Sequence, residues 1–475
     1  MDRLPVKTKI IATVGPASSS AQKIAKLINA GVDVFRFNFS HGNHEEHKKV
    51  IEIIHAYNRK YHTHISVLAD LSGPKIRVGD IPDGKRFLKK GERVIFTTNR
   101  KQEGDEKIFV NYAHLAKEVK AGEKVLLDDG KLELKIISTD RKENIALRVI
   151  YGGFLSSRKG VNLPQSKLSV SAMTEKDKVD LKFALSQSAN WVALSFVRTA
   201  KDILDLKKLI KDNNKTKVIA KIEKPEAVKN IDEIIAVSDA IMVARGDLGV
   251  EIPLERVPII QKHIVQKCAE ASKPVIIATQ ILESMIQNPN ATRAEVTDIA
   301  NAVIDGADAL MLSGETSVGK YPVEAVRMMN RVLQNTERLD GIYNRPHRAK
   351  ESSLTYYSDA VCYNACKLAE EVNAKGIIGL TRSGYTAFMV ASYRPKANIY
   401  IFTDNPNLLY ILNLTWGCRA FFYDRFVGTD ETIHDIVAIL KKNKMVKKDD
   451  VLINLASMPM HHQARTNMMK VTIVK

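Results

Sequence analysis

The chain has 475 residues, of which 45% are hydrophobic and 27% are charged. This composition is typical of a folded globular protein and excludes a disordered, collagen-like or mucin-like chain. Lys and Arg number 72 against 54 Asp and Glu, for a net charge of +18. Such an excess favours anionic partners such as nucleic acid, acidic lipid or phosphorylated small molecules. The length predicts two or three domains.

The four cysteines are too few for a disulfide framework, and none stands in a C-x-x-C motif. Cys362 and Cys366 are four residues apart, so we expect packing thiols on one helix face. The first residues lack the apolar core of a signal peptide, and no apolar run is long enough to span a membrane. We therefore expect a cytoplasmic protein without a membrane partner.

Short apolar runs alternate with helical patterns, which indicates βα units on a parallel sheet. The expected strands are residues 9–14, 34–39, 66–71, 191–197, 218–222, 240–243, 275–279 and 309–312. Each expected strand except the third is followed by a helical pattern. Eight such units predict an α/β fold, a closed (β/α)₈ TIM barrel formed by residues 1–71 and 165–340.

Residues 72–164 interrupt this pattern with short β-rich runs separated by Gly, Asp and Asn turns. Strands are expected at 93–97, 124–127, 132–138 and 145–151, and we interpret the segment as an inserted small β-barrel domain. The insertion follows strand three at the catalytic end of such barrels, so we expect a lid. Residues 74–164 hold 20 Lys or Arg and 13 Asp or Glu, which makes the lid basic.

A third region follows a polar connector at residues 341–350. Helices and strands alternate again, with strands expected at 376–380, 399–403, 420–423, 450–455 and 470–474. This pattern therefore predicts a C-terminal α/β domain at residues 352–475, which we interpret as regulatory.

Polar residues gather where the expected barrel strands end. The clusters are residues 36–42, 70–77, 221–223, 245–249, 278–280 and 313–316. Each cluster alone is typical of a turn or a solvated strand edge. Six clusters at one rim of a barrel predict an active site there.

Glu223 and Asp247 lie on adjacent expected strands. This spacing is suited to Mg²⁺, held by two carboxylates while substrate oxygens complete the shell. The alternative is that both form salt bridges, to Lys221 or Arg245. Lys221 is two residues from Glu223 on one strand, so both side chains point to the same face.

Phosphoryl transfer depends mostly on positioning and on charge neutralisation. A clamp for the transferring phosphoryl group is formed by Arg36, Arg77 and Lys221 together with a divalent ion. The amides of Gly246 and Asp247 open a helix or turn and offer a site for a carboxylate. The rim therefore suits phosphoryl transfer.

The sequence resembles the pyruvate kinase family along essentially its whole length. The segments that carry the resemblance are 8–18 (TKIIATVGPAS), 38–42 (NFSHG), 218–223 (VIAKIE), 242–249 (MVARGDLG), 278–285 (ATQILESM), 311–316 (MLSGET) and, in the lid, 160–164 (GVNLP). Their combination and order are highly specific. The resemblance implies transfer of the phosphoryl group of phosphoenolpyruvate to ADP, which gives pyruvate and ATP in the last step of glycolysis.

The resemblance also implies roles for single residues. Glu223 and Asp247 would bind Mg²⁺ or Mn²⁺, and Lys221 would stabilise the phosphoryl group in transfer. Arg36 would bind the phosphate of the substrate, and its carboxylate would be bound by Gly246, Asp247 and Thr279. The phosphates of the nucleotide would be bound by Asn38, Ser40, His41, Arg77 and Lys159. Thr279 would also relay a proton through water and Ser313.

Family members that need K⁺ carry an acidic residue where this sequence has Lys75. They hold K⁺ at positions that match Asn38, Ser40, Asp70 and the carbonyl of Leu71. The sequence resembles the K⁺-independent branch, in which a lysine ammonium stands in for the ion and can pair with Asp70. The alternative is that Lys75 is solvated and K⁺ binds anyway. We expect K⁺ not to be required.

The segment at 381–386 follows an apolar strand and precedes a helical pattern. In related kinases this loop holds a phosphate of an activator, and the matching residues are Thr381, Arg382, Ser383, Gly384 and Thr386. The alternative is an ordinary strand-to-helix turn. Residues 457–465 lack the Trp-Arg loop of many members activated by fructose bisphosphate, so the expected phosphorylated effector stays unnamed. The resemblance further implies a homotetramer, with Arg293 in a helix suited to an interface.

Two other functions fit part of the sequence. An aldolase or lyase on the same barrel would use Lys221 as a Schiff-base nucleophile or Mg²⁺ to stabilise an enolate, but the nearby Glu223 keeps that amine charged. The net charge of +18 suits nucleic-acid binding, but no recognised binding module and no interleaved basic and aromatic stretch occurs. We therefore expect no nucleic-acid partner.

Overall fold

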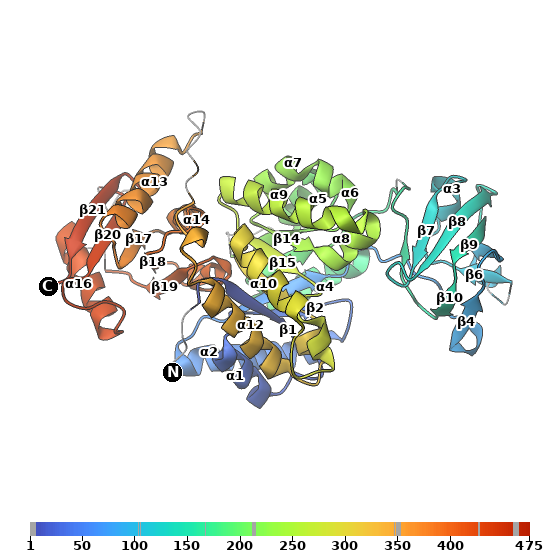
Figure 1. Cartoon of the computed structure of the whole chain (residues 1–475), viewed down its shortest axis with the longest axis horizontal. Helices are drawn as coiled ribbons and strands as arrows, with labels where there is room; N and C mark the ends of the chain where they lie inside the picture. The colour runs from blue at the N-terminus through green and yellow to red at the C-terminus, as the bar shows by residue number, and fades with distance from the viewer. Residues whose placement is uncertain are drawn as a thin grey trace.

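A computed structural model of the chain describes residues 6–102, 104, 106–166, 168–210, 215–345, 347, 353–425, 428–458 and 465–475. The barrel lies between the lid and the C-terminal α/β region, which occupy opposite ends of the molecule (Figure 1). None of the helices in these ranges is long and apolar enough to cross a membrane. The expectations about the N-terminus, the connector and the C-terminal loop rest partly on residues 1–5, 346, 348–352 and 459–464, which lie outside the described residues.

Eight parallel strands close the expected barrel. They are β1 (Lys9–Thr13), β2 (Val34–Asn38), β3 (Ser66–Leu71), β12 (Trp191–Leu194), β13 (Lys217–Ile222), β14 (Ala240–Ala244), β15 (Val275–Ala278) and β16 (Ala309–Leu312). They pair in the cyclic order β1-β16-β15-β14-β13-β12-β3-β2, which confirms the predicted fold. The strands are buried on both faces, which explains why they appear in the sequence as continuous apolar runs.

Helices surround the barrel. The longer ones are α1 (Ala21–Ala30), α2 (His44–Tyr61), α4 (Glu175–Ser186), α5 (Ala200–Ile210), α9 (Val257–Glu270), α10 (Arg293–Asp305) and α12 (Pro322–Thr336). The short helices α6 (Pro225–Lys229), α8 (Arg245–Glu251) and α11 (Gly314–Ser317) follow the ends of β13, β14 and β16, and the short helix α7 (Ile231–Val237) precedes β14. Capping boxes start α2, α4 and α10, so the loops before these helices enter at defined places.

The insertion is a β-rich lid with its own hydrophobic core. Its elements are β4 (Lys85–Leu88), β5 (Arg93–Thr97), β6 (Lys107–Phe109), α3 (Leu115–Glu118), β7 (Lys124–Leu127), β8 (Leu132–Thr139), β9 (Asn144–Tyr151), β10 (Gly153–Ser156) and β11 (Val161–Asn162). The strands pair as a six-stranded sheet, β11-β7-β8-β9-β5-β6, and a two-stranded sheet, β10-β4, instead of one closed ring. The strands that the sequence did not indicate have two to four residues, too few for a periodic pattern.

The C-terminal region is the expected α/β unit. It contains α13 (Tyr356–Glu371), β17 (Gly376–Leu380), α14 (Tyr385–Ser392), β18 (Asn398–Thr403), α15 (Pro406–Ile411), β19 (Cys418–Phe422), α16 (Thr429–Lys442), β20 (Val451–Ala456) and β21 (Met468–Ile473). The sheet order is β19-β18-β17-β20-β21. Cys362 and Cys366 share α13, and all four cysteines are buried and free. Burial raises the pKa of the Cys362 thiol to about 12, as expected of a packing thiol.

The C-terminal region packs against the end of the barrel at which the strands begin. Arg394 is buried and pairs with Asp308, just before β16, at 3.0 Å. The guanidinium also lies 4.9 Å from the ring centroid of Trp416. The opposite end of the barrel, where the strands finish, is therefore left to the lid and its loops (Figure 1).

Candidate active site

Four charged side chains meet where β2, β3 and β13 end. The Asp70 carboxylate accepts a hydrogen bond from Arg36 Nε at 2.7 Å, and its other oxygen lies 3.2 Å from Lys221 Nζ. Lys221 Nζ also lies 2.9 Å from Glu223 Oε1. All four residues are buried. We call Arg36, Asp70, Lys221 and Glu223 the rim cluster.

The rim cluster keeps Lys221 positively charged. Burial by itself would lower the pKa of Lys221, but the carboxylates of Asp70 and Glu223 outweigh burial and raise it. Burial would likewise raise the pKa of Asp70, but Lys221 and Arg36 outweigh it and lower that pKa. A lysine held as an ammonium cannot act as a Schiff-base nucleophile, which argues against the aldolase alternative.

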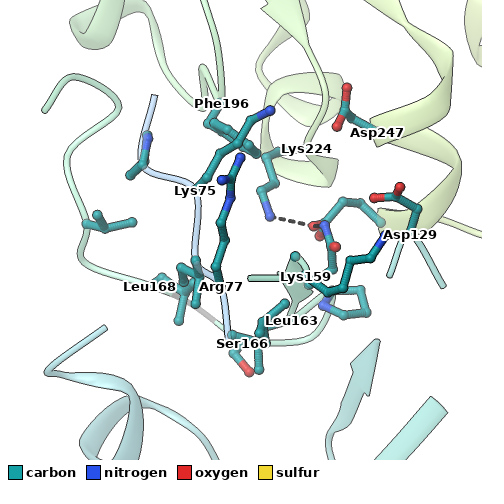
Figure 2. A pocket seen from close by; sticks show the side chains of 18 of the residues that line it. Lys75, Arg77, Asp129, Lys159, Leu163, Ser166, Leu168, Phe196, Lys224 and Asp247 are labelled. Atoms are coloured by element: carbon teal, nitrogen blue, oxygen red, sulfur yellow. Dashed lines mark hydrogen bonds and ion pairs between the residues drawn. The ribbon is translucent and has the colours of Figure 1, made fainter. Parts of the chain in front are cut away.

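Glu223 and Asp247 form a donor set that fits a divalent cation. Burial raises the pKa of Glu223, and the charge of Asp247 raises it further, because the two carboxylates repel each other. Asp247 lines a cavity, and its carboxylate has no hydrogen bond or ion pair within the described part of the chain (Figure 2). Among the described residues, no group of three or more His, Cys, Asp and Glu side chains is placed to hold a metal ion by itself, so substrate and water oxygens would complete the metal shell.

Thr279 lies against the beginning of α8. Its Oγ1 accepts a hydrogen bond from Gly246 N at 2.7 Å and donates one to Ala278 O at 2.6 Å. A Cβ at position 246 would lie 3.2 Å from Thr279 Oγ1, so the close approach favours glycine. Thr279 has a φ of +68°, a strained conformation of the kind found at functional sites.

Ser313 lies at the end of β16 and does not contact Thr279 by any hydrogen bond within the described residues. Its Oγ is buried and has no hydrogen-bond partner among the residues that the structure describes. Ser313 N donates to Glu315 Oε2 at 2.7 Å, so the backbone is fixed while the hydroxyl is uncommitted. The expected relay between Thr279 and Ser313 would therefore need a bridging group.

A cavity of about 500 Å³ opens between the barrel and the lid. His41, Lys75, Arg77, Lys159 and Asp247 are part of its lining, and Figure 2 shows Lys75 and Arg77 entering it from the segment that leads into the lid. Burial lowers the pKa of His41, and the neighbouring charges of Lys75 and Arg77 lower it further. The lining holds six Lys or Arg side chains and five Asp or Glu side chains among the described residues, and the cations on the segment that leads into the lid favour anionic ligands.

Two carboxylates hold polar groups on the lid side of the cavity, one within the lid and one from the barrel. Lys159 Nζ lies 2.7 Å from Asp128 Oδ1 within the lid. Glu251, at the end of α8, accepts hydrogen bonds from Asn162 Nδ2 at 2.8 Å and from Lys224 Nζ at 2.6 Å. Glu251 therefore joins the last lid strand to the barrel.

The positions expected for a monovalent cation come together at the ends of β2 and β3. Asn38 lies opposite Asp70 in the strand register, Asn38 Oδ1 accepts from Ser40 N at 3.1 Å, and Leu71 O accepts from Ser195 Oγ at 2.7 Å. The expected pair of Lys75 with Asp70 is not found among the described residues, because Arg36 and Lys221 occupy that carboxylate. Burial lowers the pKa of Lys75, and the neighbouring charge of Asp247 opposes that effect.

Sequence reasoning missed Ser195 and Phe196. The predicted strand ran to residue 197, but β12 ends at Leu194, and Phe196 has a φ of +56°. Lys221 Nζ donates to Ser195 Oγ at 2.7 Å, and Phe196 N donates to Glu223 Oε2 at 2.9 Å. A serine directly after an apolar run is the same signal that marked the other strand ends.

The segment expected to hold an effector phosphate joins β17 to α14, away from the cavity. Gly384 caps α14 with a φ of +85°, and Gly384 N donates to Thr381 Oγ1 at 3.1 Å. Arg382 and Ser383 are exposed, and Arg382 pairs with Asp404 at 2.9 Å. Thr386 is buried, and its hydroxyl bonds to that of Thr466 at 2.7 Å, which takes it out of reach of a ligand.

Comparisons with known proteins agree on one family. Models of the pyruvate kinase barrel domain and of the pyruvate kinase alpha/beta domain match residues 6–326 and 359–472. Pyruvate kinase of Geobacillus stearothermophilus is 42% identical over 472 residues, which cover 98% of this chain and 80% of that relative. Pyruvate kinase 2 of Synechocystis is 42% identical over 476 residues, which cover 99% of this chain and 80% of that relative.

A comparison with solved structures indicates the same family. The crystal structure of a pyruvate kinase from Cryptosporidium parvum matches this fold with a TM-score of 0.90 at 34% identity, covering 99% of this chain and 96% of that chain. The fold, the rim of the barrel and these relatives lead to one conclusion: the chain belongs to the pyruvate kinase family.

Proposed function

We propose that the rim cluster is the centre at which this chain transfers the phosphoryl group. Family membership makes the chain a phosphotransferase whose substrates are phosphoenolpyruvate and ADP. The observation that carries the proposal is the buried Lys221 ammonium, which Asp70 and Glu223 hold beside a cavity lined by Lys75 and Arg77. Positioned cations stabilise the charge that develops on a phosphoryl group during transfer.

Glu223 and Asp247 are the residues that would hold Mg²⁺ or Mn²⁺. Their mutual repulsion and the uncommitted carboxylate of Asp247 support this assignment. When bound, the ion neutralises negative charge on phosphoryl oxygens and orients the substrates. Phe196 N fixes the orientation of the Glu223 carboxylate through its hydrogen bond.

Lys221 and Arg36 act on the phosphoryl group itself. The Lys221 ammonium is held by Ser195 and Asp70. The Arg36 guanidinium is held by Asp70 and by Thr13, because Arg36 Nη1 donates to Thr13 Oγ1 at 3.0 Å. Both cations are therefore fixed before substrate arrives, which avoids reorganisation during transfer.

The remaining substrate groups are assigned to the residues around α8 and the cavity. The amides of Gly246 and Asp247 at the start of α8, with Thr279, hold the carboxylate of phosphoenolpyruvate, which replaces the hydrogen bond between Gly246 N and Thr279 Oγ1. Thr279 and a water deliver the proton to the enolate, and the uncommitted hydroxyl of Ser313 supports a place in that relay. The residues assigned to the nucleotide phosphates are Asn38, Ser40, His41, Arg77 and Lys159.

Three further assignments follow the family resemblance. A phosphorylated effector binds the loop at Thr381, Arg382 and Ser383, of which Arg382 and Ser383 are exposed, and the protein assembles as a homotetramer. A cytoplasmic location is supported by the four free, buried thiols.

Substitution of Lys221 tests the central role. We expect Lys221→Met to lower kcat by about a thousandfold or more, because a fixed cation is lost from the transferring group. Glu223→Ala is expected to act similarly and to raise the concentration of Mg²⁺ needed for activity. A coupled assay of pyruvate formation measures both. Lys217→Met is the matched control at the opposite end of β13, and it should keep kcat within about twofold. Unchanged activity in Lys221→Met and Glu223→Ala would overturn the assignment.

The proposal that K⁺ is not required has a direct test. Activity in buffer free of Na⁺ and K⁺ should stay within about threefold of activity with K⁺ added, because Lys75 supplies a positive charge near Asp247. Lys75→Met should then become dependent on K⁺. A loss of about a hundredfold in the parent protein without K⁺, equal to some 2.7 kcal/mol of barrier, contradicts the proposal.

The effector assignment is tested by titration. Fructose bisphosphate, ribose 5-phosphate and AMP are added in turn while the half-saturating concentration of phosphoenolpyruvate is measured. One of them should lower that concentration, and Arg382→Ala should weaken the effect about tenfold through loss of a charged phosphate contact. No change with any of the three compounds counts against an effector site in this loop.

A further inference from the structure

The lid is joined to the barrel by two connections that meet at the start of α4. Residues 72–76 lead from β3 toward the lid, and residues 165–166 and 168–174 belong to the connection from the last lid strand back to α4. Thr174 is the N-cap of α4, and Asp177 is the third residue of its first turn. The two residues form a capping box, so this helix begins at a defined point of the second connection.

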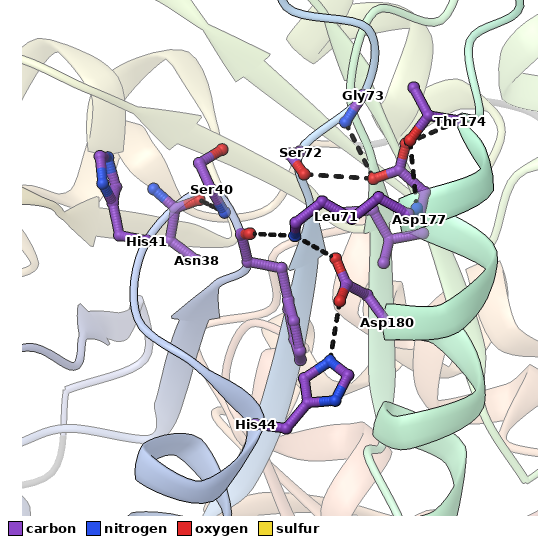
Figure 3. Close-up of polar contacts among 12 residues, drawn as sticks. Asn38, Ser40, His41, His44, Leu71, Ser72, Gly73, Thr174, Asp177 and Asp180 are labelled. Atoms are coloured by element: carbon purple, nitrogen blue, oxygen red, sulfur yellow. Dashed lines mark hydrogen bonds and ion pairs between the residues drawn. The ribbon is translucent and has the colours of Figure 1, made fainter.

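The Asp177 carboxylate contacts both connections at once (Figure 3). Its Oδ1 accepts hydrogen bonds from Gly73 N at 3.1 Å and from Ser72 Oγ at 3.3 Å. Its Oδ2 accepts from Thr174 N at 2.8 Å and from Thr174 Oγ1 at 2.6 Å. One side chain thus binds two donors on the way into the lid and two on the way out.

Asp177 is fully buried, with 0% of its surface exposed, and no ion pair to it occurs in the described ranges. A buried carboxylate without a counter-charge is stable only when its oxygens accept hydrogen bonds. The four donors therefore supply the compensation that an arginine or lysine would give elsewhere. Loss of any donor leaves part of the charge unsatisfied, so both connections are held in place.

The first connection turns sharply at the point that Asp177 holds. Gly73 has a φ of +66°, and a Cβ there would lie 2.7 Å from the ring of Phe196. Lys75 N donates to Gly73 O at 3.0 Å directly after the turn. The direction of this turn consequently sets where Lys75 and Arg77 enter the cavity.

We propose that Asp177 is a positioning residue for phosphoryl transfer, which fixes both lid connections to α4 and so places Lys75 and Arg77 opposite Asp247. Asp177 itself does not line the cavity, and it acts through the turn at Ser72 and Gly73. The proposal rests on the proposed function of the cavity as the nucleotide and phosphoryl site.

Asp177→Asn is the sharpest variant because it keeps the size of the side chain. The amide nitrogen must then face the N–H donors of one connection, and that connection loses its acceptor. We expect KM for ADP to rise about tenfold while kcat falls less than about threefold, since ground-state placement is disturbed more than the chemistry. Amide hydrogen exchange at residues 72–77 in the free protein should become at least about tenfold faster.

Glu175→Gln is the matched control. Glu175 lies in the same first turn, is exposed, and pairs with Lys178 at 2.6 Å. The same carboxylate-to-amide change there should leave KM, kcat and exchange at residues 72–77 at the parent values. Ser72→Ala removes one donor of the first connection, and it should shift KM for ADP in the same direction by about twofold to threefold.

Two outcomes overturn the proposal. The first is that both Asp177→Asn and Ser72→Ala keep the KM for ADP and the hydrogen exchange at residues 72–77 of the parent protein. This result contradicts the proposal even if the variants lose thermal stability. A fall in kcat with KM unchanged also contradicts it. Hydrogen exchange is measured without turnover, so it reports the role of Asp177 in the connections even if the Lys221 and Glu223 variants disprove the proposed site.

Discussion

The contact of Asp70 with Arg36 and Lys221 is the interaction on which the mouth of the barrel depends. Each of these charges would cost several kcal/mol to bury alone, so each requires an opposite charge within reach. Asp70 supplies one carboxylate to two cations, and Glu223 supplies a second carboxylate to Lys221. The four charges of the rim cluster then cancel. Asp247 stays outside this cluster and has no hydrogen bond or ion pair within the described residues, which leaves its carboxylate available to a divalent cation.

Both parts of the site carry charges of both signs. The barrel contributes the carboxylate of Asp247 together with Arg198 and Lys224, whereas the lid and its first connection contribute Lys75, Arg77 and Lys159 together with Asp128 and Asp129. Two anionic substrates and a cation suit a cavity of this kind, because each ligand meets an opposite charge in the lining. The catalytic geometry therefore depends on how the lid is joined to the barrel, and the buried Asp177 carboxylate lies at that junction.

The sequence was sufficient for the barrel because strands buried on both faces appear as unbroken apolar runs, and for most of the rim because polar residues end those runs. Ser195 and Phe196 escaped because an apolar run followed by a serine and an aromatic residue resembles a longer strand. The partner of Lys75 could not be predicted, because it depends on the relative placement of β3, β13 and α8, which are far apart in the chain. The division of the lid into two sheets rests on strands too short to show a period.

The pH dependence of kcat tests most directly whether the rim cluster holds Lys221 as a permanent cation. Asp70 and Glu223 raise the pKa of Lys221, so the account predicts that no loss of kcat up to about pH 9.5 comes from this residue. The profiles of the parent protein and of Lys221→Arg, which cannot lose its proton, should then have the same shape in this range. A loss of activity with a midpoint near pH 8 in the parent that disappears in Lys221→Arg would contradict the account.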